Sequence, residues 1–364
     1  MKKRVVLEIV LFLALCLLLL VGVKKHFFTS PEDADDVVAE FVRYDDPDIL
    51  GIRITKIGQA VIDSVDTVNS GRGDYQPGRF EQALDLYRDK PLASRDLASV
   101  GLVCNYSIEK YKSDDGREND VIELTPKDGV TCDLTILCVH GGGYLMDLAD
   151  FELRGFDDLA QKCHAKAIVP CYDPIFHGTY KEAYELLLSV YRDILAKGGK
   201  VALTGSSAGG GLALGFVEYL NEIGEKIPEK LILYCPWIDA TLTNPSIDDY
   251  IMRDKCLGVY GLQQLGVLWA DDLDPSDYRI SPIKGDLSKP MPDTLLYTGT
   301  EEILYPDAEL LYRTFKENGH QICMVRGEGL YHVFMFSSLP EARKANEIAY
   351  GFLLDDMSIW DQAS

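Results

Sequence analysis

The stretch Val201-Ala-Leu-Thr-Gly-Ser-Ser-Ala-Gly-Gly-Gly211 reads as a short buried strand that runs into a glycine-bounded turn and then into an apolar helix. The strand half, Val201 to Thr204, lies between glycines, as a central strand of a parallel sheet does. Ser207 would stand on the sharp turn, where side chains in place of the flanking glycines would collide with the neighbouring strand and helix. The first free N–H groups of the helix would stabilise negative charge there. The pattern Gly205-x-Ser207-x-Gly209 predicts the nucleophile elbow of an acyl-transfer hydrolase, and the alternative is a simple Gly/Ser loop.

Composition limits the classes to which the chain can belong. Its 364 residues are 47% hydrophobic and 26% charged, which suits one large core, and we expect one catalytic domain with a membrane tail. The formal net charge of -22 argues against nucleic acid and against electrostatic docking on anionic lipid. The nine cysteines form no CxxC pair and no Cys/His cluster at zinc spacing, so we expect buried free thiols and no metal site.

The N-terminus predicts a membrane anchor over residues 1–28. An apolar run from Val5 to Val23, interrupted only by Glu8, lies between Met1-Lys-Lys-Arg4 and Lys24-Lys25, and about 20 such residues suffice to span a bilayer. A cleaved signal peptide is the alternative, but its apolar region is normally shorter and ends in small residues. The slight excess of Lys and Arg on the N-terminal flank favours a cytoplasmic N-terminus and an extracytoplasmic body.

Residues 29–100 are acidic and amphipathic, and we expect them to form a helical lid or a packed N-terminal arm. Apolar residues recur at helical spacing at Val37, Val38, Phe41 and Val42, and again at Phe80, Ala83, Leu84 and Tyr87. The charge runs between them are interpreted as solvated faces.

Residues 101–364 alternate strands with helices, which predicts a mostly parallel sheet covered by helices on both faces. The expected strands are Leu102–Ile108, Asp120–Thr125, Leu134–Val139, Ala167–Cys171, Val201–Thr204, Lys230–Cys235, Thr294–Thr298 and Gln321–Val325. The expected helices are Tyr180–Ala196, Ala208–Leu220, Asp307–Glu317 and Pro340–Leu354. The segment 240–290 separates two of the strands and is the natural place for a cap over the sheet.

A glycine loop follows one of these strands. The strand Leu134–Val139 runs into His140-Gly-Gly-Gly-Tyr144, and three glycines let the backbone turn its N–H groups toward a ligand, as an oxyanion hole requires. The loop is not a phosphate-binding P-loop, because no Gly-Lys-Ser/Thr follows it. The alternative interpretation of this glycine loop is a flexible turn.

With these motifs the sequence resembles the hormone-sensitive-lipase-like branch of the α/β-hydrolases, over roughly residues 120–354. His140-Gly-Gly-Gly-Tyr144 matches the family's HGGG box, and Gly205-Ser-Ser-Ala-Gly-Gly210 matches its GDSAGG elbow. Pro236-Trp237-Ile-Asp239 and Leu268-Trp-Ala270 fall where related bacterial esterases carry similar short motifs. The resemblance implies an α/β-hydrolase fold.

The resemblance also implies an oxyanion hole and shows one departure. The N–H groups of Gly142, Gly143 and Ala208 would form that hole. Ser206 stands where the family usually has aspartate, which leaves the nucleophile intact but puts in doubt any contact that the aspartate would make.

The acid of the triad must follow the serine on this fold. After the strand Thr294–Thr298 comes Gly299-Thr-Glu-Glu302-Ile-Leu304, where the family reads Gly-x-x-Asp-x-Leu, and this places the acid on Glu302. Glu301 and Asp307 are the nearby alternatives, although Asp307 suits the start of the next helix, where a carboxylate complements the helix dipole.

Two histidines follow the acid, and topology separates them. His320 precedes the strand Gln321–Val325, whereas His332 follows that strand and so reaches the carboxyl edge, where active groups of such sheets gather. His332-Val-Phe334 also resembles the family's His-x-Phe, so we take His332 as the base and His320 as a surface histidine. His140 is expected to hold the glycine loop by hydrogen bonds.

Together these features predict a membrane-anchored serine hydrolase that cleaves carboxylic esters without a cofactor. Ser207 would attack, His332 would transfer the proton, and Glu302 would orient the imidazole. A peptidase or amidase shares this triad and is the alternative among enzymes. A binding protein that kept the fold without the chemistry is the alternative outside them.

Overall fold

The computed structural model describes residues 38–60, 77–92, 95–113, 116–358 and 360. The strands are β1 (Glu40–Arg43), β2 (Ile49–Arg53), β3 (Asn105–Lys112), β4 (Glu118–Thr125), β5 (Leu134–Val139), β6 (Lys166–Pro170), β7 (Lys200–Ser206), β8 (Lys230–Tyr234), β9 (Asp293–Gly299) and β10 (Ile322–Glu328). The helices are α5 (Pro77–Arg88), α6 (Asp150–Cys163), α7 (Tyr180–Ala196), α8 (Ala208–Glu222), α9 (Val259–Ala270), α10 (Tyr305–Glu317) and α11 (Pro340–Leu353). Short 3-10 helices are η1 (Leu97–Ser99), η2 (Pro245–Asp249), η3 (Pro282–Lys284) and η4 (Phe334–Phe336).

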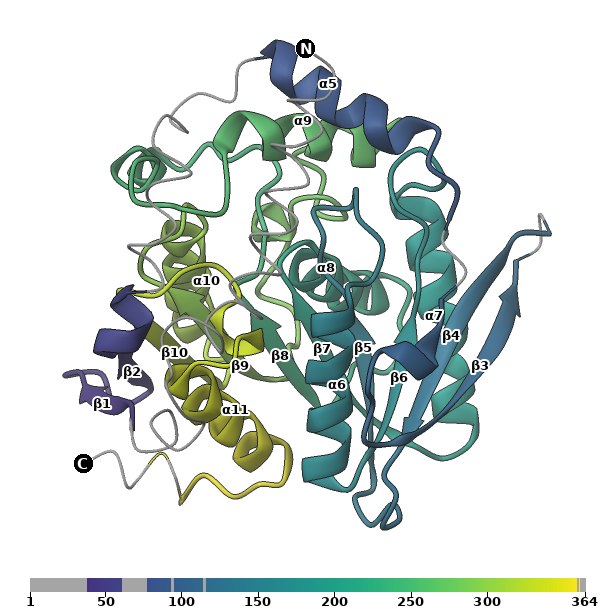
Figure 1. The fold of residues 1–364 in the computed structure, drawn as a ribbon, viewed down its shortest axis with the longest axis horizontal. Helices are drawn as coiled ribbons and strands as arrows, with labels where there is room; N and C mark the ends of the chain where they lie inside the picture. The colour runs from purple at the N-terminus through teal and green to yellow at the C-terminus, as the bar shows by residue number, and fades with distance from the viewer. Residues whose placement is uncertain (1–37, 61–76, 93–94, 114–115, 359, 361–364) are drawn as a thin grey trace.

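The ten strands form one twisted sheet in the order β1-β2-β10-β9-β8-β7-β5-β6-β4-β3 (Figure 1). The pairs β1–β2, β3–β4 and β4–β6 are antiparallel, and all other pairs are parallel. The prediction of a mostly parallel sheet is therefore confirmed. The apolar strands β5, β7, β8 and β9 lie in the middle of this order, because a strand that is buried on both faces must be apolar throughout.

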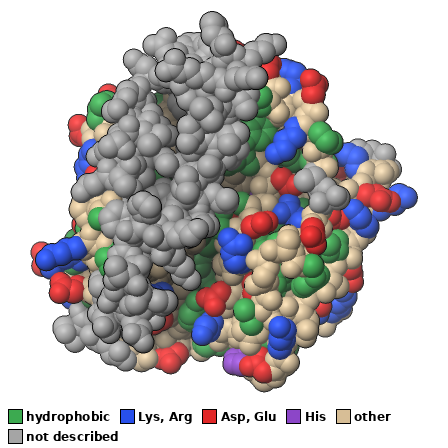
Figure 2. Space-filling model, viewed as in Figure 1, with side chains coloured by type: hydrophobic (Ala, Val, Ile, Leu, Met, Phe, Trp, Pro, Cys, Tyr) green, Lys and Arg blue, Asp and Glu red, His purple; other side chains and the backbone are tan. Residues whose placement is uncertain are grey.

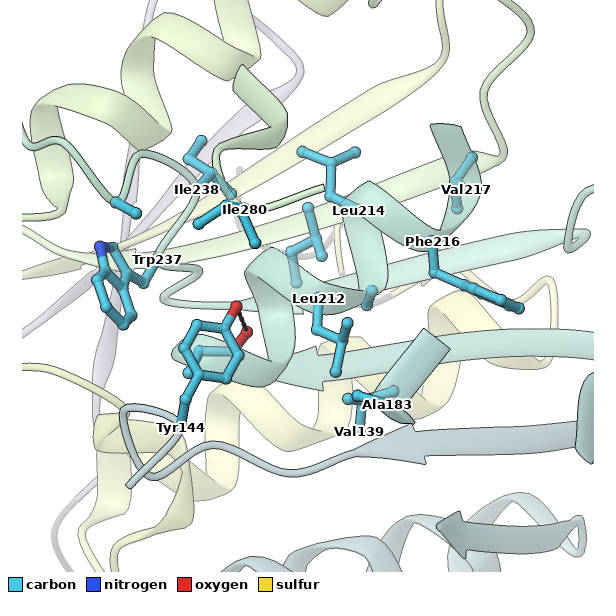
Figure 3. Packing of buried hydrophobic residues seen from close by; sticks show 14 of the residues in the cluster. Val139, Tyr144, Ala183, Leu212, Leu214, Phe216, Val217, Trp237, Ile238 and Ile280 are labelled. Atoms are coloured by element: carbon cyan, nitrogen blue, oxygen red, sulfur yellow. Dashed lines mark hydrogen bonds between the residues drawn. The ribbon is translucent and has the colours of Figure 1, made fainter. Parts of the chain in front are cut away.

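Helices cover both faces of the sheet, and each face has its own core. Val201 and Leu203 of β7 belong to the core that includes α7, α8 and α10, whereas Ala202 between them belongs to the core that includes α6 and α11. Alternate side chains of a strand point to opposite faces, so a short apolar strand supplies both cores. Figure 3 shows the first core, in which Leu212 and Phe216 of α8 pack beside Val139 of β5.

The segment 240–290, for which a cap remains a prediction, leaves the carboxyl end of β8 and contains helix α9. Helix α9 and the N-terminal helix α5 lie side by side over the carboxyl edge of the sheet (Figure 1), and the rings of Phe80 and Tyr260 meet edge to face with centroids 5.8 Å apart. The helical spacing at Phe80, Leu84 and Tyr87 is thus confirmed by α5, and Phe80 and Leu84 are its buried residues.

Two parts of the sequence prediction were wrong. The expected helix around Phe41 and Val42 is strand β1, which pairs with β2, and β2 adds to the sheet beside β10. Hydrogen bonds to β2, which follows across a short turn and itself pairs with β10, decide this segment. Helical spacing over six residues is too short to oppose them. Helix α6 was not predicted at all, although it covers the second face of the sheet.

Among the residues that the structure describes, no helix is long and apolar enough to cross a membrane. The predicted anchor, Val5 to Val23, lies outside the described residues, as does the spacing at Val37. Where side chains are described, acidic and basic residues are interspersed over the visible face (Figure 2). The cysteines of the described residues are free, as expected, and Cys104, Cys138, Cys163 and Cys235 are buried.

Candidate active site

Ser207 occupies a strained turn between β7 and α8. Its backbone has φ 53° and ψ -121°, a conformation that a residue with a Cβ adopts only at a cost of about 1–3 kcal/mol. Hydrogen bonds hold it there: the Ser207 N–H donates to the carbonyl of Tyr234 at 2.9 Å, and the Ser207 carbonyl accepts from the N–H of Trp237 at 2.8 Å. The turn therefore holds the serine hydroxyl above the carboxyl edge of the sheet.

The glycines of the elbow are required by close contact. A Cβ on Gly205 would lie 2.2 Å from the carbonyl oxygen of Gly209, and a Cβ on Gly209 would lie 2.3 Å from the carbonyl oxygen of His140. These neighbours are backbone atoms, which cannot move aside as a flexible side chain can. The collision with the neighbouring strand and helix that the sequence predicted is thus found in the structure.

The structure brings Ser207, His332 and Glu302 together. The Ser207 hydroxyl lies 2.8 Å from Nε2 of His332, and Nδ1 of His332 lies 2.5 Å from Oε2 of Glu302. The carboxylate can only accept, so Nδ1 carries the proton and donates it to Glu302, which leaves Nε2 free to accept from the serine. Glu302 is 0% exposed and His332 is 7% exposed, so water is largely excluded from this chain of hydrogen bonds.

Glu302 receives two further hydrogen bonds. Its Oε1 accepts from the Thr298 hydroxyl at 2.9 Å and from the N–H of Gly299 at 2.9 Å, both at the end of β9. A buried carboxylate stays charged only when such donors replace its lost water. This contact of Thr298 was not predicted, although a polar residue in an otherwise apolar strand is a signal that the sequence offers.

The alternatives for the acid point elsewhere. Glu301 pairs with the guanidinium of Arg253. Asp307 lies in the first turn of α10 and accepts from the amide of Asn244 at 2.9 Å, and burial raises its pKa to about 6. Neither carboxylate bonds to His332.

Three other histidines, His320, His164 and His177, contact groups outside this chain of hydrogen bonds. His320 precedes β10, and its Nε2 lies 2.7 Å from the carbonyl oxygen of Leu287, while its ring packs edge to face on Phe315. His164 lies 3.4 Å from Asp128, and Nε2 of His177 lies 2.8 Å from the carbonyl oxygen of Lys90. His26 lies outside the described residues.

The glycine loop after β5 lies against the start of α8. Gly142 and Gly143 have φ values of 100° and 62°, which glycine adopts without strain. No group in the described part of the chain accepts from the N–H of Gly142, Gly143 or Ala208. The hydroxyl of Tyr144 donates to the carbonyl of Ala208 at 2.8 Å (Figure 3), which ties the loop to the elbow.

His140 is buried at the start of this loop and bonds to its backbone. It is 0% exposed, its Nδ1 donates to the carbonyl of Gly141 at 2.9 Å, and its ring stacks on Tyr172 with centroids 4.1 Å apart. Burial lowers the pKa of His140 below its ordinary value, so the ring is neutral near pH 7. This fits the expectation that His140 holds the loop and does not move protons.

Helix α6 also contacts the glycine loop, through Glu152. Oε1 of Glu152 accepts from the N–H of Gly141 at 2.8 Å and from the hydroxyl of Ser206. Both Glu152 and Ser206 are buried. The sequence analysis did not single out Glu152.

Two more buried groups lie beside Glu302 and His332. The Cys235 sulfur accepts from the N–H of Val333 at 3.3 Å, and burial raises the pKa of this thiol well above its ordinary range. Asp254 accepts from the N–H groups of Cys256 and Ile303 at 2.7 and 2.8 Å, which fastens the cap segment to the residue after Glu302, and burial raises its pKa to about 6.

One group of three possible metal ligands occurs among the described residues. It comprises Cys235, Glu302 and His332, whose donor atoms lie within 4.8 Å of one another. One hydrogen bond already joins Glu302 to His332, and the Cys235 thiol is protonated at neutral pH because burial raises its pKa. These residues therefore fit a proton relay better than an ion.

Comparison with known proteins gives the same fold. A family model described as the alpha/beta hydrolase fold matches residues 136–336. The chain is 26% identical over 288 residues to an acetyl-hydrolase of Streptomyces hygroscopicus, which covers 77% of this chain and 90% of the relative. It is 30% identical over 216 residues to an esterase of Acinetobacter venetianus, covering 58% of this chain and 71% of the relative.

Solved structures agree with the architecture. An esterase from the bacterial hormone-sensitive lipase family superposes with a TM-score of 0.65 at 22% identity, covering 78% of this chain and 100% of that one. An esterase/lipase from an uncultured bacterium superposes with a TM-score of 0.63 at 22% identity, covering 78% of this chain and 99% of that one. Likeness at this level of identity speaks for the fold.

Proposed function

We propose that this chain, which belongs to the α/β-hydrolase fold family and is a carboxylic ester hydrolase, falls in the hormone-sensitive-lipase-like branch and works through a triad of Ser207, His332 and Glu302. The observation that carries this proposal is the continuous chain of hydrogen bonds from Glu302 through His332 to a serine on a strained elbow. Nucleophile, base and orienting acid are thus within bonding distance in the free enzyme.

The reaction would begin when the Ser207 oxygen attacks the ester carbonyl and His332 Nε2 takes the serine proton. The tetrahedral intermediate then collapses, its bond to the alkoxy oxygen breaks, and His332 returns the proton to the leaving alcohol. Water attacks the acyl-enzyme with the same base, which releases the carboxylic acid and restores the Ser207 hydroxyl. Each proton taken by His332 is given back, so the cycle needs no further reactant.

Charge is matched at both ends of this relay. The imidazolium formed at His332 faces the buried carboxylate of Glu302, which the donors Thr298 and Gly299 hold in place. At the other end, the N–H groups of Gly142, Gly143 and Ala208 would receive the oxyanion. Donors that are already oriented before reaction lower the barrier without reorganisation, and losing one typically costs a factor of about 10²–10³.

An ester substrate must be distinguished from an amide. Relatives named acetyl-hydrolase and esterase favour esters, and we expect hydrolysis of p-nitrophenyl butyrate but not of an aminoacyl p-nitroanilide. The opposite preference would indicate a peptidase, and inactivity on both would indicate a binding protein with this fold.

We further propose that α5 and α9 cap the entrance and set the length of the acyl group. Leu265 of α9 reaches the glycine loop, since a Cβ on Gly143 would lie 3.3 Å from its Cδ1. An apolar side chain so near the oxyanion loop would contact the substrate. A series of p-nitrophenyl esters of rising chain length, assayed on the wild type and on Leu265→Ala, tests this: the variant should shift its optimum toward longer chains, and an unchanged profile contradicts it.

Residues 1–28 are proposed to anchor the enzyme to a membrane with the catalytic domain on the extracytoplasmic side, an inference from the sequence alone. The full chain should then stay with membranes after carbonate washing and keep its N-terminus. A chain that begins at Thr29 should be released and still hydrolyse esters. An intact mass that begins shortly after Val23 would instead mean a cleaved signal peptide, and digestion of the body only after cell lysis would reverse the orientation.

A further inference from the structure

One carboxylate oxygen links the two halves of the site. Oε1 of Glu152 accepts from the backbone N–H of Gly141, which precedes the proposed oxyanion donors, and from the hydroxyl of Ser206, which precedes the proposed nucleophile. Glu152 is 4% exposed and Ser206 is 0% exposed. The contact is therefore dry, and hydrogen bonds to a charged acceptor in such surroundings are among the strong ones.

We infer, on the premise that Ser207 is the nucleophile, that Glu152 is a positioning residue that sets the distance between the oxyanion loop and the serine. Its carboxylate touches neither substrate nor reacting atoms. It holds Gly141 close to Ser206. Because Gly142 and Ser207 are the next residues along the chain, the distance between them is set by the same contact.

The same pair explains why a serine is tolerated before the nucleophile. The family usually has aspartate at position 206, whereas here the carboxylate comes from helix α6 and the elbow contributes a hydroxyl that donates to it. An aspartate at 206 would place a second buried carboxylate against Glu152, which like charges in a dry site disfavour. Glu152 and Ser206 thus form one pair, in which helix α6 supplies the carboxylate and the elbow supplies the hydroxyl that donates to it.

Packing leaves the loop little freedom apart from this contact. A Cβ on Gly141 would lie 2.9 Å from the carbonyl oxygen of Ser206 and 3.1 Å from Oε1 of Glu152. The three groups are therefore in close contact, and removing the carboxylate would open a gap at the base of the loop. Misplacing a reacting group by about 1 Å can cost about 10²-fold in rate.

Helix α6 offers a matched control. Asp157 lies on the same helix, is also buried, and its carboxylate accepts from the N–H groups of Val103 and Cys104 at 2.7 and 2.9 Å. It performs the same kind of structural task but touches no part of the site. Asp157→Asn therefore reports what the loss of such an anchor does to stability alone.

The first test measures kcat, KM and thermal unfolding for Glu152→Ala, Glu152→Gln and Asp157→Asn with p-nitrophenyl butyrate. Glu152→Ala should lower kcat by about 100-fold with KM changed by less than about threefold. Glu152→Gln should lose about tenfold or less, because an amide oxygen can accept the same two donors. Asp157→Asn should lower the melting temperature and keep kcat.

Equal losses of stability in Glu152→Ala and Asp157→Asn with unchanged kcat in both would overturn the inference. If Glu152→Ala does not fold, the decision falls to Glu152→Gln and Ser206→Ala, which remove one charge and one hydroxyl. A drop in kcat of about threefold to tenfold in each, at unchanged melting temperature, supports the inference. Wild-type kcat in both contradicts it.

A second test exchanges the partners. Ser206→Asp alone should lower both kcat and stability, because it sets two buried carboxylates in contact. Adding Glu152→Ser to Ser206→Asp should raise kcat above that of Ser206→Asp, because one carboxylate and one hydroxyl face each other again. Losses that simply multiply would show that the two positions are independent and would contradict the inference.

Labelling with a fluorophosphonate separates this inference from the proposed function. An adduct on Ser207 of the wild type, together with unchanged kcat in Glu152→Ala, contradicts only the positioning role. An adduct on another residue contradicts the proposed function and the positioning role with it.

Discussion

The two edges of the sheet carry the same kinds of residue in different arrangements. At the carboxyl edge, the buried Glu302 and His332 bond to each other at 2.5 Å, and Thr298 and Gly299 satisfy the second oxygen of the carboxylate. Toward the opposite edge, His320 bonds to a backbone carbonyl, and the buried Glu218 of α8 has an oxygen without a partner among the described residues.

The two glutamates show what makes a buried carboxylate usable. Burial without enough donors raises the pKa of Glu218 to about 9, so this group is a neutral acid at pH 7. Glu302 is more deeply buried but accepts three hydrogen bonds, from Thr298, Gly299 and His332. Donors placed at a strand end, and not burial as such, allow a carboxylate to orient a histidine.

The largest effect should come from removing the nucleophile at the carboxyl edge. Ser207→Ala should lower kcat for p-nitrophenyl butyrate by a factor of about 10⁶ while the protein stays folded, since Ser207 is half-buried and loses little packing with one hydroxyl. The neighbour Ser206→Ala is the control and should lose far less. A comparable loss at Ser206 would mean that the other serine attacks.

Exchanging the histidines at the two ends of β10 tests the comparison directly. His332→Gln should lower kcat nearly as much as loss of the serine, because members of a triad act as a unit. His320→Gln should keep the wild-type rate. A large loss in His320→Gln with a wild-type rate in His332→Gln would mean that the base lies at the opposite edge of the sheet.

Glu302→Gln should cost a factor of about 10⁴ in kcat, less than loss of serine or histidine. The amide still fills the space but cannot hold the imidazole in the tautomer that leaves Nε2 free. KM should change little, since Glu302 does not reach the substrate. Wild-type kcat in this variant, with a large loss in Asp307→Asn or Glu301→Gln instead, would show that the acid was misassigned.

The smallest effect concerns the opposite edge and appears in stability. A folded pKa of about 9 against an ordinary 4.5 means that Glu218 contributes stability below pH 4.5 and loses it as pH rises toward 9. Glu218→Gln should therefore raise the melting temperature at pH 8 by about 2–4 °C and change it little at pH 5, with unchanged kcat. A variant that is less stable at pH 8 would contradict the neutral carboxyl group.

The residues at the carboxyl edge could be predicted because local rules identify them. The order serine, acid, histidine and the end of the strand at which each lies required only short patterns, and the bounds of β5 and α7 agree with the prediction to the residue. The collisions that side chains at positions 205 and 209 would make could be predicted because the turn between the strand and the helix is sharp.

Long-range contacts account for what the sequence analysis missed. Helix α6 has apolar residues at helical spacing in Leu153, Phe156, Leu159 and Ala160, but Glu152 and Asp157 interrupt that pattern on the buried side. These acids face inward because they accept N–H groups from residues 11 and 54 positions away, a pairing that no local pattern encodes. Strand β1 was mistaken for a helix for a different reason: its helical spacing covers only six residues, and its pairing with β2 across a short turn makes it a strand.

The most direct test of the central claim is to trap the acyl-enzyme. The wild type is mixed with p-nitrophenyl acetate, quenched in acid during the first turnover, digested, and its peptides weighed. The account predicts one acetyl group per chain, on the peptide that contains Ser207, and no acetyl group in Ser207→Ala. Acetyl on Ser206 or on a cysteine, or turnover without any acylated peptide in a quench that captures the burst, would contradict it.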